Sequence, residues 1–180
     1  MMTSDAVIRH YLEDAIAAEK TSETQLGQFA REGDDEEVRA AFAAHVQETQ
    51  RQHERLTARL EALGGGSTSA KTFLAQLFSL APKPIHVGHD PEERIAQNLV
   101  LAYTLESGEC AMYEALAAAA EAAGDDRTEQ LAREIQAQER QAADRMWRLI
   151  NSRAKIAFNL LTIGETDPSV NTKVQDNPLI

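Results

Sequence analysis

Four long segments with helical periodicity, separated by short breaks rich in glycine, aspartate and proline, constrain the fold more than any other feature of this sequence. In each segment apolar residues recur at three- and four-residue spacing, which is the pattern of a helix with one buried face. Alanine, glutamate, glutamine, leucine and arginine predominate and favour helices, whereas aromatic residues make up only 5%. The sequence therefore predicts an all-α protein, with helices over about residues 4–31, 36–63, 90–124 and 126–151.

The lengths of the breaks predict how these helices are connected. Gly33-Asp34-Asp35 and Gly124-Asp125 are short, so the first two helices and the last two helices should form antiparallel hairpins. The connector from 67 to 89 is long enough to cross the bundle, and its segment 70–80 is predicted to be a short amphipathic helix. Two hairpins joined by one long crossover are the connectivity of a ferritin-like four-helix bundle.

The C-terminal residues are predicted to extend this bundle. A further short helix is expected over 153–161, and the tail over 164–180 lacks periodicity and is rich in Pro, Asn, Asp and Thr. A chain of 180 residues suits one domain with a real core. We therefore expect a helical bundle over residues 1–163 and an irregular arm over 164–180.

Charge and apolar composition limit the classes of partner. The formal net charge is −11 and no run of Lys and Arg occurs, so nucleic acid is not an expected partner. No apolar run is long enough to cross a membrane, and the N-terminus lacks the apolar core of a signal peptide. Cys110 is the single cysteine, so no disulfide can form within the chain. We expect a cytoplasmic protein with no membrane partner.

Polar residues interrupt the apolar stripes of all four helices. Glu19 lies in the middle of the first stripe, and Glu106 and Glu109 occupy two successive steps of the third. The interruptions of the second stripe are Thr49 and His53, and that of the fourth is Gln138, with Glu139 one position to the side.

These interruptions also agree in height along the bundle. Folding the first hairpin about its break brings Glu19 level with Thr49 and beside Glu48, and folding the second brings Glu109 within a turn of Glu139. Buried carboxylates without partners are costly, and several together repel one another. Protons, basic side chains or metal ions must therefore compensate them.

Two interpretations follow from this polar layer. The first is a layer of water and salt bridges, in which Arg145 and His53 neutralise Glu19 and Glu106. The second is a site for two metal ions, which uses a Glu from each of two helices and a Glu-x-x-His motif from each of the other two. The sequence supplies the single carboxylates. However, Gln50 stands three residues before His53, and Ala142 stands three residues after Glu139.

Several stretches resemble the YciE/YciF-type ferritin-like stress proteins over about residues 5–150. They are Tyr11 to Lys20; Phe42 to Leu63 with His45, Glu48-Thr49 and Glu54-Arg55-Leu56; Glu106-Ser107-Gly108-Glu109 with Tyr113 and Leu116; and Glu139 with Ala142-Ala143-Asp144. The resemblance implies a rubrerythrin-related bundle, commonly dimeric, with a di-metal centre. By position it implies the metal ligands Glu19, Glu48, Glu106, Glu109 and Glu139, to which the second stripe adds His53. Gln47-Glu48 and Gln138-Glu139 stand where the family has paired glutamates.

The leading hypothesis is thus a homodimeric, ferritin-like protein that binds two iron or manganese ions. Its activity would be oxygen or peroxide chemistry in stress protection, as in a di-iron oxidoreductase or peroxidase. The alternative is a metal-free helical scaffold or dimeric stress protein, in which the same carboxylates form a buried polar network.

Overall fold

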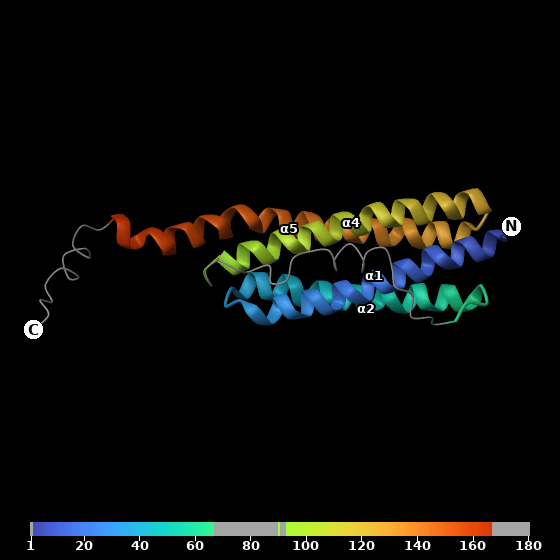
Figure 1. Ribbon diagram of the computed structural model, residues 1–180, viewed down its shortest axis with the longest axis horizontal. Coiled ribbons are helices and arrows are strands. Elements are labelled where there is room, and N and C mark those ends of the chain that lie inside the picture. Colours follow the sequence, from blue (N-terminus) through green and yellow to red (C-terminus); the bar gives the residue numbers. More distant parts are fainter. Residues whose placement is uncertain (1, 67–89, 91–92, 167–180) are drawn as a thin grey trace, which may run out of the picture.

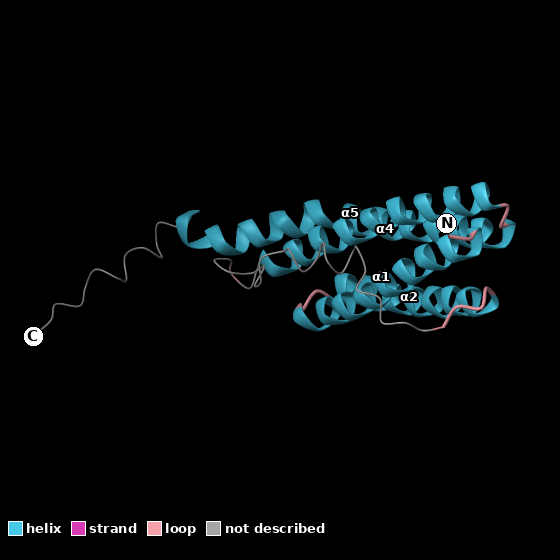
Figure 2. Cartoon of the chain, turned by 45° about the vertical axis from the view of Figure 1, so that its right-hand side comes forward, coloured by secondary structure: helices cyan, strands magenta, loops and turns pink. Residues whose placement is uncertain are grey.

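The computed structural model describes residues 2–66, 90 and 93–166, with side chains up to residue 162 (Figure 1). The helices in these residues pack as two antiparallel hairpins side by side, α1 with α2 and α4 with α5 (Figures 1 and 2). The predicted all-α, ferritin-like four-helix bundle is confirmed. The helices are α1 Ser4–Glu32, α2 Glu36–Ala62, α4 Arg94–Ala123 and α5 Asp126–Thr166.

Side-chain caps explain why the helices begin and end at the predicted breaks. The Asp35 carboxylate accepts a hydrogen bond from the Val38 N–H at the start of α2, and the Asp125 carboxylate accepts one from the Thr128 N–H at the start of α5. Gly124 ends α4 in the left-handed conformation, with φ 72°, which glycine adopts without a steric penalty. The two Gly-Asp-Asp breaks therefore both place an aspartate as the cap of the following helix.

Two apolar clusters fill the bundle, one on each side of the polar layer. The first contains Ile8, Leu12, Leu56 and Leu116 among others, and the second is Leu26, Phe29, Val38, Phe42, Leu99, Ala102 and Met146. Burying a Leu, Ile or Phe side chain contributes about 1.5–3 kcal/mol, so these clusters supply most of the stabilising energy. On each helix, the residues that lie between the members of the two clusters form the polar layer. The layer is therefore in the middle of the bundle.

The last helix differs from its prediction. It was expected to end near residue 151 and to be followed by a separate helix over 153–161, but α5 is continuous to Thr166. Neither Gly nor Pro occurs between residues 151 and 161, and Arg153 pairs with Asp35 at the turn between α1 and α2. The helix includes the first residues of the predicted arm and projects past the bundle (Figure 1).

The predicted crossover helix over 70–80 and the arm beyond residue 166 lie outside the described residues. Among the described helices, none combines the length and hydropathy that a membrane span requires.

Candidate metal centre

All four helices contribute polar side chains to the layer between the two apolar clusters. On α2 the buried residues follow one another at steps of three or four, so that His45 and Gln52 face the same interior as Phe42 and Leu56. None of the layer's principal side chains is more than 2% exposed. They are Glu19 from α1, His45 and Gln52 from α2, Glu106 and Glu109 from α4, and Glu139 from α5.

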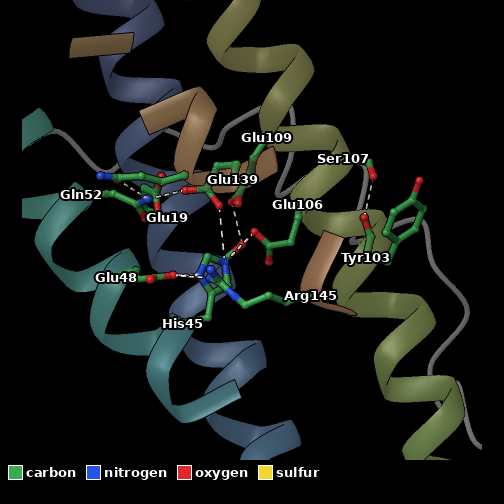
Figure 3. A network of polar contacts seen from close by, with 12 residues as sticks. Glu19, His45, Glu48, Gln52, Tyr103, Glu106, Ser107, Glu109, Glu139 and Arg145 are labelled. Atoms are coloured by element: carbon green, nitrogen blue, oxygen red, sulfur yellow. Dashed lines mark hydrogen bonds and ion pairs between the residues drawn. The ribbon is translucent and has the colours of Figure 1, made fainter. Parts of the chain in front are cut away.

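The inner nitrogen of His45 faces two carboxylates from the other hairpin, Glu106 and Glu139 (Figure 3). Its Nε2 donates to Glu106 Oε2 at 2.6 Å and lies 3.4 Å from Glu139 Oε2. One donor atom of each of these three residues lies within 4.8 Å of the others, which is close enough for a single ion to bind all three.

The other nitrogen of the His45 ring points toward the surface. Its Nδ1 donates to Glu48 Oε2 at 3.0 Å, and Arg145 donates to the same oxygen at 2.5 Å (Figure 3). Burial lowers the pKa of His45, but hydrogen bonding to Glu106 and the contacts with Glu139 and Glu48 outweigh burial and raise the pKa to about 12. Without a metal ion, His45 is therefore a buried cation held by carboxylates.

Glu19 and Glu109 extend the layer on the far side of Glu139. Tyr113 donates its hydroxyl hydrogen bond to Glu19 Oε1, and Ser22 donates to Glu109 Oε1 at 2.6 Å. Burial, followed by repulsion from neighbouring carboxylates, raises the pKa of both Glu19 and Glu109 well above the usual value. Burial also raises the pKa of Glu106, to about 8, although His45 opposes the shift. The layer thus holds protons that a divalent cation could replace.

The donor set fits such a cation. Three carboxylate oxygens in the layer are buried and have no hydrogen-bond partner among the described residues: Glu19 Oε2, Glu106 Oε1 and Glu139 Oε2. A buried acceptor of this kind costs about 1–3 kcal/mol if nothing compensates it. Carboxylate oxygens with one imidazole nitrogen are typical ligands for divalent iron and manganese.

The structure brings together four of the six residues predicted as metal ligands: Glu19, Glu106, Glu109 and Glu139. Glu48 lies at the edge of the layer, 31% exposed, and contacts it through His45. His53 is only half-buried and lies outside the cluster, one position beyond the buried Gln52. That each of these residues binds metal stays a prediction.

Two details of the predicted stripes are wrong. On α2 the apolar stripe expected from the sequence includes Val46 and is interrupted at His53, whereas His45 and Gln52 are the buried residues. On α5 Gln138 is exposed, and Glu139 takes the buried position that was assigned to it. Each error is a shift of one residue, or 100° around the helix, which an apolar stripe of this width does not distinguish.

The same shift explains why His45 was not predicted as a site residue. The signal for it was the three-residue spacing of His45 and Glu48, which is the Glu-x-x-His spacing of di-metal bundles in reverse order. The predicted salt-bridged layer is also rearranged. Glu106 pairs with His45 and not with His53, and Arg145 pairs with Glu48 and not with Glu19.

Comparisons with known proteins identify relatives of this chain. The sequence profile described as "Domain of unknown function (DUF892)" matches residues 4–158. Protein YciF of Escherichia coli is 30% identical over 142 residues, which cover 78% of this chain and 86% of YciF.

Two solved structures have a similar fold. The crystal structure of the E. coli stress protein YciF matches with a TM-score of 0.73 at 28% identity, over 86% of this chain and 99% of that one. A protein from Xanthomonas campestris matches with a TM-score of 0.70 at 26% identity, over 91% of this chain and 99% of that one.

Proposed function

The chain belongs to the DUF892 family, and from this premise we propose that it is a ferritin-like protein that binds two iron or manganese ions in its polar layer. One observation supports the proposal above all others. Glu19, Glu106 and Glu139 each have one buried carboxylate oxygen without a hydrogen-bond partner among the described residues, and His45 Nε2 lies within 3.4 Å of an oxygen of Glu106 and of Glu139. A helical bundle of this kind builds di-metal sites from inward-facing Glu and His side chains.

The residues divide naturally between two ions. His45, Glu106 and Glu139 would hold one ion, since their donor atoms lie within 4.8 Å of one another. Glu19 and Glu109 would hold the second, each with one oxygen already bound by a neighbouring hydroxyl group. When bound, iron or manganese supplies the exchange of electrons with oxygen or peroxide.

The protein itself would orient the ligands and keep water away from them. Glu48, which is itself paired with Arg145, accepts a hydrogen bond from the outer nitrogen of His45, and this contact fixes the ring with Nε2 directed at the interior. Tyr113 and Ser22 do the same for Glu19 and Glu109. The apolar clusters on both sides exclude water, so the layer is a low-dielectric environment.

We place this activity in stress protection, by peroxide or oxygen consumption. The solved relative from E. coli is described as a stress protein, and that description is the support for this role. The protein would act as a cytoplasmic homodimer.

One observation favours a second candidate, a metal-free scaffold. Protonated His45 already bridges Glu106, Glu139 and Glu48, so the layer is partly neutralised without any metal. In that case the carboxylates would serve only as a buried polar network that joins the two hairpins.

Metal content distinguishes the two candidates. Protein purified without a histidine tag is loaded anaerobically with ferrous iron or manganese, desalted and analysed by elemental mass spectrometry. We expect about two ions per chain in the wild type and in the control Glu54→Gln, which changes an exposed residue of α2. Glu106→Gln should retain fewer than half as many.

Wild-type protein that retains no stoichiometric metal would exclude the di-metal centre and leave the scaffold. If metal is bound, the rate of peroxide consumption by loaded wild type and Glu106→Gln tests the proposed chemistry. Equal rates in the two proteins would contradict it.

A further inference from the structure

A cavity of about 310 Å³ lies between α2 and α5, and two of its lining residues contact ligands of the proposed metal centre. Glu48 accepts a hydrogen bond from His45 Nδ1, and Gln52 donates through Nε2 to Glu139 Oε1 (Figure 3). The cavity therefore reaches from solvent to the immediate surroundings of these ligands. Its remaining lining residues are all exposed: Arg51, Arg55, Gln138 and Gln141.

The side chain of Gln52 lies between this cavity and the polar layer. It is 1% exposed, so it closes the inner end of the cavity. Its Nε2 donates to Gln138 Oε1 at 3.0 Å, on the cavity side, and to Glu139 Oε1, in the layer. A shorter side chain at this position would therefore join the cavity to the Glu139 carboxylate.

The packing of the bundle makes this side the most direct approach to the layer. The two apolar clusters close the layer toward both ends of the bundle. Of the helix pairs that are neighbours in the bundle, α2 and α5 are the least closely packed in the part of the chain that the structure describes. A molecule from solvent thus meets less protein between α2 and α5 than along the bundle axis.

The charges of the lining disfavour a cation on this approach. Arg51 and Arg55 are positive, and the one carboxylate of the lining, Glu48, already pairs with Arg145 and His45. An uncharged molecule that forms hydrogen bonds, such as hydrogen peroxide, is not repelled and meets amide and guanidinium donors. The lining therefore suits a small neutral oxidant better than it suits the metal ions themselves.

We propose that this cavity is the approach by which hydrogen peroxide reaches the proposed metal centre, and that Gln52 is the residue that excludes bulky organic hydroperoxides. The inference rests on the proposed di-metal function and specifies its substrate class. Hydrogen peroxide is only slightly larger than water, so a rotation of the Gln52 side chain admits it. An aromatic hydroperoxide needs a wider opening, which only a shorter side chain provides.

The reaction is the same for both classes of peroxide, so their rates can be compared. The O–O bond breaks as it takes up one electron from each of two ferrous ions together with two protons. Hydrogen peroxide yields two water molecules, and cumene hydroperoxide yields one water molecule and one alcohol. Ferrous iron in solution gives the ratio of intrinsic reactivities, and any further preference of the protein reports on access.

Stopped-flow oxidation of the full-length, ferrous-loaded protein by each peroxide tests the proposal. Relative to iron in solution, we expect the wild type to prefer hydrogen peroxide about tenfold. Gln52→Ala should lose this preference. Gln52→Met, which keeps the length of the side chain without its amide, should retain it, and so should the control Gln136→Ala, at a buried glutamine that ties α5 to α4. A wild type without the preference, or its loss in Gln52→Met as well, would overturn the role of Gln52.

Removal of the iron by bipyridine, a bulky chelator, gives a readout without peroxide. At equal iron content, removal should be faster from Gln52→Ala than from Gln52→Met, and equal rates would contradict the proposed approach. If Gln52→Ala fails to fold, Gln52→Ser replaces it. Wild-type protein that retains no iron would contradict the di-metal function itself, whereas retained iron with no preference between the peroxides contradicts this inference alone.

Discussion

At the scale of single residues, His45 and Glu106 make the folded protein bind protons more tightly than the unfolded chain. The pKa of His45 rises from 6.5 to about 12, and that of Glu106 from 4.5 to about 8. The contribution of His45 is complete below pH 6.5 and is lost as the pH rises toward 12. The contribution of protonated Glu106 is lost between pH 4.5 and about 8. Both pKa shifts therefore stabilise the folded protein more at low pH than at high pH.

We expect the free energy of unfolding of the metal-free protein to fall as the pH rises from 6.5 to about 8, where both groups act. Each proton that unfolding releases contributes up to about 1.4 kcal/mol per pH unit. Urea unfolding in the presence of a chelator measures the slope, and Glu106→Gln should make it shallower. Stability that rises over this interval would contradict the arrangement of the layer.

Glu109 should be a residue whose removal stabilises the metal-free protein. It is fully buried beside other carboxylates, and the Ser22 hydroxyl that donates to it can donate equally well to a glutamine oxygen. We expect Glu109→Gln to raise the free energy of unfolding by about 1–2 kcal/mol in chelator and to weaken metal binding. Calorimetry with and without metal measures both effects, with Glu54→Gln as the surface control. A destabilised metal-free variant would argue that Glu109 is already satisfied.

The carboxylates of the layer could be predicted from the sequence because a charge within an apolar stripe is conspicuous. Glu19, Glu106 and Glu109 interrupt stripes of Leu and Ala, and their burial follows directly. His45 could not be identified with the same certainty, because Val46 beside it continues the stripe equally well. Packing against the second hairpin determines whether His45 or Val46 is buried. The apolar stripe of a single helix holds no information about that packing.

At the scale of the elements, local sequence signals predict the turns of both hairpins correctly but do not predict where α5 ends. The two Gly-Asp-Asp breaks contain both the stop and the cap, so they fix the helix ends locally. Residues 151–153, Asn-Ser-Arg, contain weak helix formers and suggested a break. The helix continues because Arg153 binds Asp35 and Glu37 on the neighbouring hairpin, which is a tertiary interaction.

Arg153→Ala should therefore loosen the projecting part of α5. Arg153 is 14% exposed and makes two hydrogen bonds to Asp35, at 3.0 and 3.1 Å, so its loss should cost about 1–2 kcal/mol. We expect faster hydrogen exchange in residues 154–162 and little change in the first half of α5. Arg148→Ala, at an exposed arginine five residues earlier, is the matched control. Equal protection in both variants would show that α5 is helical by local propensity alone.

At the scale of the whole molecule, the second half of α5 exposes large apolar side chains. Trp147 is 61% exposed and Phe158 is 65% exposed, and the others are Ile156, Leu160 and Leu161. Several large exposed apolar side chains on one helix are typical of a contact surface. The expected homodimer would gain most if a second copy covered it.

The chain's one tryptophan reports on this expectation. We expect acrylamide quenching of Trp147 to decrease, and its emission to shift to shorter wavelength, as protein concentration rises and sedimentation shows a dimer. Phe158→Ser should move both transitions to higher concentration, whereas Val100→Ser, at an exposed apolar residue of α4, should not. A protein that sediments as a monomer at all concentrations would contradict the dimer.

Because the polar layer is divided between two hairpins, a bound ion would affect the rate of unfolding as well as the stability. Glu19 and His45 belong to one hairpin, and Glu106, Glu109 and Glu139 belong to the other. Neither hairpin alone offers the full donor set, so an ion that needs both halves is captured only after they dock. Its stabilisation then falls on the finished bundle and not on the folding transition state. Such an ion would leave the folding rate unchanged and lengthen the half-life of the folded protein, which would come apart only as fast as it released the metal.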